Sequence, residues 1–437
     1  MPPMVSHDRV RFQVGRFRDQ LWVRPMLVCL MSISGVLIAK LADRTPLADL
    51  APEISHDSLG LLLSIMASSM LVIATFAVGS MVSAYSSAAS SVTPRSLALV
   101  MADDLAQNAL STFIAAFIFS IVALTALNNG FYAAAGVFTL FTMTAIVFGI
   151  VIVTFVRWVD RIARLGRLST CINQIEQATS IAMSRRRHAQ TLGGIALQPG
   201  AEGGMAVFSA AVGYVLHVDV AALQGCAARL NGHVVVAALP GTFAAPGKPL
   251  AYLQIPSGQP AEADSLQIAH AFVIGEERLF DDDPRFGLVV LSEIAGRALP
   301  PAANDPGTAI NIIGTVVRLF ALWARPLETP VSGPVKYDRV SVPQLSVADM
   351  FDDAFTSIGR DGAGLVEVAL RLQKALHSLT LLNDDAMREA AMHHSRVALG
   401  RCERRMDSAE DLAIIHAAAR FSESLEAEQT EAQITAH

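Results

Sequence analysis

The sequence has little charge for its length. Asp, Glu, Lys and Arg make up 16% of its 437 residues, whereas 52% of the residues are hydrophobic and the mean hydropathy is +0.44. Soluble globular domains carry about a quarter charged residues, so this composition excludes a wholly water-soluble protein. It also excludes an intrinsically disordered chain, because disordered chains are poor in apolar residues.

Charge is scarcest in four long apolar runs near the N-terminus, none of which has Asp, Glu or His at its centre. Each run approaches the roughly 20 residues that cross a bilayer as a helix. We therefore predict a four-helix transmembrane domain in residues 1–157, with spans at about 22–41, 59–82, 110–127 and 131–156. The alternative, buried helices of a large soluble core, would need four such helices in a row near the N-terminus.

Arginines flank the set of predicted spans. They precede the first span and follow the fourth, at Arg9, Arg11, Arg16, Arg18, Arg24, Arg157, Arg161, Arg164 and Arg167. The loop between the first two spans is acidic instead. The positive-inside rule then predicts a multi-pass protein with both termini in the cytoplasm. The first span lacks a small-residue cleavage site, so we interpret it as a retained signal anchor.

Cysteine is also scarce, and acidic residues outnumber basic ones in the rest of the chain. The four cysteines form no C-x-x-C pair, so we expect no structural disulfides. Residues 158–437 contain 24 Lys and Arg against 31 Asp and Glu, a net charge of −7. We therefore expect no binding to nucleic acid, because phosphate contacts require a basic face.

Residues 158–437 are predicted to form a cytoplasmic α+β domain in three parts. Residues 158–187 form a helical stalk or linker, residues 188–260 a small β-rich module, and residues 261–437 a mostly helical part. Alternating apolar residues predict the strands. Two Asp-Pro pairs, Asp283-Pro284 and Asp305-Pro306, predict helix starts, because Asp is a good N-cap and Pro suits the first helical position. The second of these helices is apolar nearly all round and should be deeply buried.

The linker allows two interpretations. Leu165, Leu168, Ile172 and Ile175 have coiled-coil spacing, which would suit an oligomerising stalk. The same residues would equally suit a helix packed on its own cytoplasmic domain. The run 185–188, three arginines and a histidine, is interpreted as a solvated helix C-terminus, which the helix dipole favours.

Two segments resemble a known bacterial family. One comprises residues 277–288, 294–299 and 304–309, and the other comprises 83–87 with Thr93-Pro94-Arg95. Together they resemble the signatures of the domain of unknown function 2254 family of predicted membrane proteins, in the same order along nearly the whole chain. The resemblance implies a bacterial inner-membrane protein with this architecture, and it brings no activity with it.

Polar residues within the more characteristic segment form the candidate site. They are Arg278, Asp283, Glu293, Arg297, Asn304 and Asp305. These residues could form a cytoplasmic binding site, or they could serve only in helix capping and ion pairing. Two other groups could hold a metal ion by residue type, Asp281-Asp282-Asp283 and His393-His394 with Asp384 and Asp385. Adjacent side chains on a helix diverge, so helix capping and a solvated face are the preferred interpretations. We predict no metal and no cofactor.

Catalytic motifs are missing, so we do not predict an enzyme. The predicted second and third spans instead contain small and hydroxyl residues at four-residue spacing, such as Ser64 with Ser68 and Gly79 with Ser83. The first hypothesis is a homo-oligomeric channel or pore with a cytoplasmic regulatory domain. The alternative is a membrane-anchored sensor or scaffold that binds an unknown ligand or protein partner. The absence of carboxylates and histidines within the spans argues against a proton-coupled transporter.

Overall fold

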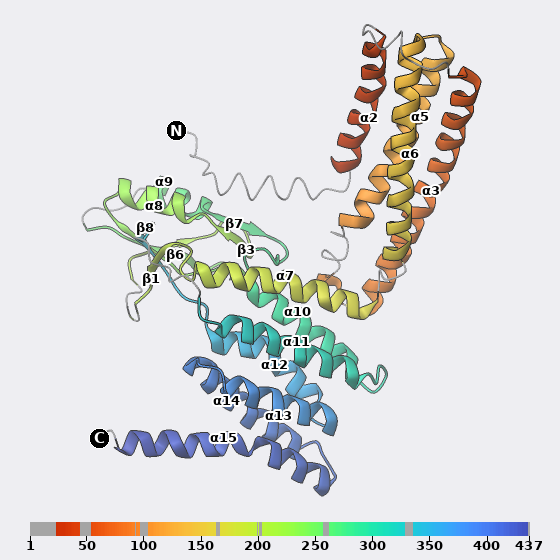
Figure 1. Ribbon diagram of the computed structural model, residues 1–437. Helices are drawn as coiled ribbons and strands as arrows, with labels where there is room; N and C mark the ends of the chain where they lie inside the picture. The colour runs from red at the N-terminus through yellow and green to blue at the C-terminus, as the bar shows by residue number, and fades with distance from the viewer. Residues whose placement is uncertain are drawn as a thin grey trace. The chain divides into compact units, whose positions relative to one another are not determined.

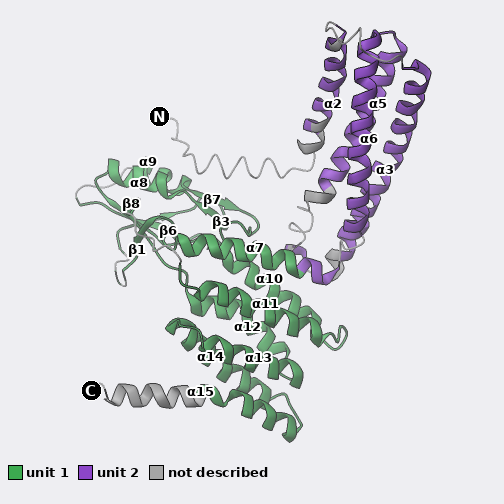
Figure 2. Ribbon diagram, viewed as in Figure 1, with its two compact units in different colours: residues 1–9, 172–437 green, residues 10–171 purple. Residues whose placement is uncertain are grey.

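The protein divides into two compact units (Figure 2), which are described separately. The structure is a computed structural model that describes residues 23–43, 54–91, 93–96, 104–162, 167–198, 200, 203–256, 262–327 and 335–435. Unit 2 contains residues 10–171, and unit 1 contains residues 172–437 with the first nine. The N-terminal arginines before Arg24 and the positions Arg164 and Leu165 lie outside the described residues.

Unit 2 is a bundle of long helices (Figure 1). The helices are α2 (Val23–Ala42), α3 (His56–Ser91), α5 (Asp104–Asn128) and α6 (Ala134–Ile162). A short 3-10 turn, Pro94–Ser96, follows α3. Helix α5 packs against the other three. The rings of Phe113 and Trp158, both fully buried, meet edge to face at 6.0 Å between α5 and α6. The four helices predicted from the sequence are therefore present, with α3 extending past both ends of its predicted span.

The outward faces of unit 2 are apolar. Most of the large hydrophobic side chains that are exposed in the described residues belong to this bundle, including Leu61, Val72, Phe76, Ile146 and Val156. Soluble proteins rarely expose contiguous apolar surface on this scale, whereas lipid-facing helices require it. Three of these helices are long and apolar enough to cross a membrane, and α2 contains a shorter apolar segment, Cys29–Leu41.

Unit 1 begins within α7 (Leu168–His188) and continues into two small sheets. Sheet A has the strand order β1-β8-β4-β6-β2, and sheet B has the order β5-β3-β7. The strands are β1 (Gly194–Ala196), β2 (Met205–Phe208), β3 (Gly213–Val218), β4 (His233–Val236), β5 (Phe243–Ala244), β6 (Pro249–Gln254), β7 (Phe272–Gly275) and β8 (Tyr337–Val342). Helices α8 (Val220–Arg229) and α9 (Glu262–His270) pack on this part, and Asp219 caps α8 as expected.

The β-rich part extends beyond the predicted segment 188–260. Strand β7 pairs with β3, and β8 lies parallel between β1 and β4 although it is separated from β6 by about eighty residues of chain. The central place of β8 makes the sheet depend on residues that follow two of the long helices. Local patterning cannot predict such a pairing, because the partner strand lies far away in sequence.

Layers of helices form the rest of unit 1 (Figure 1). They are α10 (Pro284–Ala298), α11 (Pro306–Ala324), α12 (Val347–Asp361), α13 (Val366–Thr380), α14 (Asp385–Glu403) and α15 (Ala409–Thr435). Helix α10 packs on α11 and α12, and α13 packs on α11, α14 and α15. The rings of Phe320, Phe351 and Phe355 form the aromatic core between α11 and α12, with centroids 4.3 to 5.9 Å apart.

Helix α11 is less buried than the sequence predicts, and the burial of α7 distinguishes the two interpretations of the linker. Helix α11 is long and apolar enough to cross a membrane by composition, but it packs one face inside unit 1 and exposes Asn311 and Arg318 on the other. Helix α7 buries Ile172 and Ile175 within its own chain. Of the two interpretations of the linker, packing on its own domain is therefore the one that these residues follow.

Candidate functional site

The six predicted site residues do not converge. Arg278 and Asp283 meet at the N-terminus of α10, whereas Asn304 and Asp305 follow its C-terminus. A helix of 15 residues separates the two groups by about 22 Å at 1.5 Å per residue. Glu293 lies on α10, and the Arg297 side chain is exposed near its C-terminal end.

Asp305 caps α11, as the Asp-Pro pattern predicted. Its carboxylate accepts hydrogen bonds from the Thr308 backbone amide at 3.1 Å and from the Thr308 hydroxyl at 2.6 Å. Asn304 has a φ of +46°, a conformation that Asn tolerates better than most residues. Both side chains are exposed, so these two residues act chiefly as a helix start and a turn.

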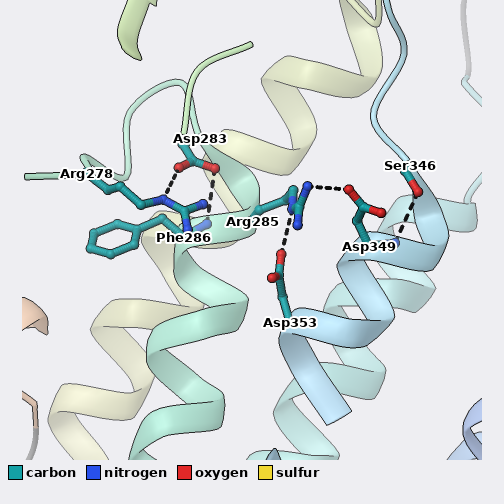
Figure 3. A network of polar contacts seen from close by, with 7 residues as sticks. All are labelled: Arg278, Asp283, Arg285, Phe286, Ser346, Asp349 and Asp353. Atoms are coloured by element: carbon teal, nitrogen blue, oxygen red, sulfur yellow. Dashed lines mark hydrogen bonds and ion pairs between the residues drawn. The ribbon is translucent and has the colours of Figure 1, made fainter. Parts of the chain in front are cut away.

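Asp283 is the buried centre of the other group (Figure 3). It caps α10 by accepting from the Phe286 amide at 3.2 Å, and Arg278 Nε donates to its other oxygen at 2.7 Å. The Arg278 guanidinium also lies 5.2 Å from the centre of the Phe286 ring. Burial raises the pKa of Asp283, and the pairing with Arg278 offsets this only in part.

The turn between β4 and β5 approaches this carboxylate closely. Gly241 has a φ of +91°, and a Cβ atom at this position would overlap the Asp283 side chain. Glycine is required there for two reasons, since it permits the left-handed backbone and the close contact. Asp283 therefore joins the β-rich part to the start of α10.

Arg285 connects α10 to α12 (Figure 3). Its Nε donates to Asp353 and its Nη1 to Asp349, each at 2.6 Å. The Ser346 hydroxyl caps α12 by accepting from the Asp349 backbone amide. Burial lowers the pKa of Arg285, but the two aspartates outweigh this effect and raise it overall. An arginine held between two carboxylates has a fixed orientation, so this contact sets the spacing of the two helices.

Asp282 connects α7, β3 and the loop before α10. It accepts from His217 Nδ1 at 2.7 Å and from Arg185 at 3.2 Å. Burial raises the pKa of Asp282, but hydrogen bonds from His217 and Arg185 lower it overall. We call this whole set the arginine–aspartate hub, which consists of Arg185, Arg186, His217, Arg278, Asp282, Asp283, Arg285, Asp349 and Asp353.

Arg186 is the unexpected member of the hub. Only 4% of the residue is exposed, and none of its three guanidinium nitrogens has a hydrogen-bond partner. Burial lowers its pKa to about 10, against the attraction of Asp282 and Asp283. Arg187 is also buried and donates to the Arg325 carbonyl. The expected solvated C-terminus of α7 is thus wrong for Arg186 and Arg187.

Helical periodicity could have placed Arg186 correctly. Ile172, Ile175, Thr179 and Met183 repeat every three or four residues and are all buried, and Arg186 continues the same face. A cation on a buried face requires nearby carboxylates, and Asp282 and Asp283 supply them.

The other proposed metal group is separated in the structure. Asp384 caps α14 and Asp385 pairs with Arg388, whereas His394 turns toward Asp352 at 3.2 Å. In the part of the chain that the structure describes, no group of three or more His, Cys, Asp or Glu residues could hold a metal ion. His394 packs against the rings of Phe351 and Phe355, and its burial lowers its pKa to about 4.

Two of the grooves in the described part of the chain are candidate sites. One, of about 880 Å³, follows the outer face of α3 and is lined by Val72, Thr75, Phe76, Gly79, Ser80, Ser83, Ala84, Ser87 and Ile162. The other, of about 470 Å³, lies between the start of α12 and α14 and is lined chiefly by Ser346, Asp352, Glu389, His393, His394 and Arg396. The first is rich in small and hydroxyl side chains, and the second carries charges of both signs.

Comparisons with known proteins show the family of this chain and give no activity. The family described as "Predicted membrane protein (DUF2254)" matches residues 18–378. "Uncharacterized protein Mb1321c" of Mycobacterium bovis and "Uncharacterized protein Rv1290c" of Mycobacterium tuberculosis are 29% identical to the chain over 160 residues, which is 35% of this chain and 30% of each relative. The match therefore spans about a third of the length of these relatives. No solved structure matches the chain.

Proposed function

This chain belongs to the DUF2254 family of predicted membrane proteins, and from that premise we propose that it forms a homo-oligomeric channel or pore with unit 1 as its regulatory part. The proposal assigns the helices of unit 2 to the bilayer. It assigns the outer face of α3 to the contact between copies or to the lining of the pore.

One observation carries the proposal. Along the exposed face of α3, Ser64, Ser68, Thr75, Gly79 and Ser83 follow one another at spacings of four and seven residues. The Ser68 and Thr75 hydroxyls donate to carbonyls one turn earlier, which satisfies their protons while their oxygens still accept from water. Around this stripe the outward faces are formed by large apolar side chains. The stripe therefore differs from a surface suited only to lipid.

The interior of a single bundle supports an oligomer rather than a pore through one copy. The buried hydroxyls of Ser111, Ser120 and Thr144 each donate to a carbonyl four residues earlier, and the rings of Phe113 and Trp158 pack edge to face between α5 and α6. Small residues at four-residue spacing allow two helices to approach closely. A conducting path would then lie between copies, where the α3 faces meet.

The chain offers a matched pair of variants for testing this. Gly79 on α3 and Gly149 on α6 are both exposed, and a Cβ atom added at either position meets nothing within 4 Å. Leucine at each position therefore fits a single copy equally well. Gly79→Leu would fill the proposed contact, whereas Gly149→Leu would only face lipid.

The experiment measures ion flux from purified protein in liposomes, together with the oligomeric state of the same sample. We expect the native protein and Gly149→Leu to be oligomeric and to conduct. Gly79→Leu should lose at least one of these properties. A monomer without flux would refute the channel proposal, and equal behaviour of the two variants would refute the role of the α3 face.

We also propose the orientation that the flanking arginines favour, with both termini in the cytoplasm and the protein in the bacterial inner membrane. Positive residues in the C-terminal part of α6, Arg157 and Arg161, support it. Reporter fusions test it. A cytoplasmic reporter should be active after residue 437 and inactive within residues 44–53, and the reverse pattern would refute the orientation.

A membrane-anchored sensor or scaffold is the second candidate. The observation in its favour is the groove of about 470 Å³ between α12 and α14, which carries two histidines with Asp352, Glu389 and Arg396. Such a lining suits a small polar ligand or a charged segment of a partner protein. A folded protein that gives no flux but loses its cellular role when Glu389 is changed to Ala would favour this candidate.

A further inference from the structure

Two adjacent turns of unit 1 form an exposed apolar surface, which we call the apolar tip. It consists of residues 208–214 and 243–248. Strand β2 pairs with β6 so that Phe208 lies opposite Pro249, and β3 pairs with β5 so that Gly213 lies opposite Ala244. The turns that join β2 to β3 and β5 to β6 therefore run side by side at the end of the β-rich part.

Large side chains of the tip remain exposed after folding. Val212 is 60% exposed, Phe208 47% and Phe243 42%. The rings of Phe243 and Tyr214 meet edge to face at 5.1 Å, so the aromatic surface is held in place by the strand pairing. In the described part of unit 1, the other large exposed apolar side chains, such as Ile181, lie on separate elements.

The tip also lacks charge within an acidic part of the chain. Residues 205–216 and 234–247 contain no Asp, Glu, Lys or Arg, and the exposed Lys248 directly follows the second range. Residues 158–437 as a whole carry a net charge of −7. Anionic lipid headgroups repel acidic surfaces and attract lysine, so this uncharged tip with one lysine suits a bilayer.

We propose that the apolar tip inserts into the interface of the bilayer that holds the helices of unit 2. Aromatic rings favour the level of the headgroups, where their apolar faces leave water. Only a short segment separates the end of α6 at Ile162 from the first residue of unit 1, Ile172. This tether keeps unit 1 close to the membrane, and a high effective concentration makes even weak insertion persistent.

Tryptophan quenching by brominated lipids tests the insertion in the full chain reconstituted in liposomes. Phe243→Trp reports on the tip and preserves its aromatic character. Leu381→Trp is the matched negative control, because Leu381 is 74% exposed at the end of α13, outside the tip. Phe148→Trp, on the outward face of α6, is the positive control. The emission of each added tryptophan is obtained by subtracting that of the native protein.

We expect bromine on the acyl chains to reduce the added emission of Phe243→Trp and Phe148→Trp by about twofold or more, because an interfacial ring lies within reach of the upper acyl chain. The emission of Leu381→Trp should not change. Val212→Glu, combined with Phe243→Trp, should abolish the quenching at the tip.

An unquenched Phe243→Trp would overturn the proposal. In that case, emission shifted to shorter wavelength would indicate that a second copy or another segment of the chain covers the tip. Val212→Trp repeats the measurement on the neighbouring turn if Phe243→Trp fails to fold. An unquenched Phe148→Trp would overturn the membrane position of α6 and the proposal with it.

Discussion

The two Asp-Pro helix starts should differ in their contribution to stability, although their sequences look alike. Asp283 and Asp305 both cap a helix that begins with proline. Asp283 is 4% exposed and is paired with Arg278, whereas Asp305 is exposed. Replacement of each by alanine therefore separates helix capping from the contribution of the arginine–aspartate hub.

The magnitudes follow from the contacts that are lost. Loss of an N-cap costs about 1 kcal/mol, and this is the whole effect expected for Asp305→Ala. Asp283→Ala also leaves the Arg278 guanidinium without its buried partner. The cost of breaking a buried pair is about 3 to 5 kcal/mol, and it falls to about 2 kcal/mol here because the Arg278 side chain is 18% exposed. The expected total for Asp283→Ala is about 3 kcal/mol.

Peptide-resolved hydrogen exchange on the full chain measures both effects where they occur. A loss of about 3 kcal/mol raises the exchange rate of α10 amides by about two orders of magnitude, and a loss of about 1 kcal/mol raises that of α11 amides about fivefold. Asp283→Asn should lie between, because Asn caps well but carries no charge. Equal effects in α10 and α11, or Asp283→Asn matching Asp283→Ala, would refute the reasoning.

Three further predictions concern the same part of the chain. Arg285→Ala should lower the free energy of unfolding by about 2 kcal/mol, because it removes a bridge between two carboxylates. Arg388→Ala breaks one exposed pair and should lower it by less than about 0.5 kcal/mol. Equal losses of stability in thermal unfolding would contradict this. Burial lowers the pKa of His394 in the folded protein to about 4. As the pH decreases from about 6.5 to 4, the unfolded chain binds a proton at this histidine and the folded protein does not. The free energy of unfolding should therefore fall over this range. Replacing His394 by Gln should flatten this dependence, and parallel pH profiles of melting temperature would exclude the assigned cause. Gly247→Ala should cost about 1 kcal/mol for its left-handed backbone, and Gly241→Ala should cost clearly more because its methyl group overlaps a carboxylate; similar denaturation midpoints would show that the overlap relaxes.

Local signals predicted the helix starts well, because a cap acts through neighbouring backbone amides. Asp219, Asp283 and Asp305 each accept from the amide three residues later, as expected from residue type and the following pattern. The helices of unit 2 were equally accessible, since a run of about twenty uncharged apolar residues leaves few alternatives. The sequence did not predict which of the candidate site residues lie together. They are close in sequence, but the 15 residues of α10 separate the two groups in space.

What the sequence determined by itself was therefore whatever depends on neighbours along the chain: the apolar bundle, the capped helices and the turns. Only the tertiary structure decided which distant segments meet. It placed β8 inside sheet A, turned Arg186 toward Asp282 and Asp283, and divided the polar residues of the family signature between the two ends of α10. The physical reason is that caps and hydropathy act over a few residues, whereas strand pairing and buried ion pairs depend on how the whole chain packs.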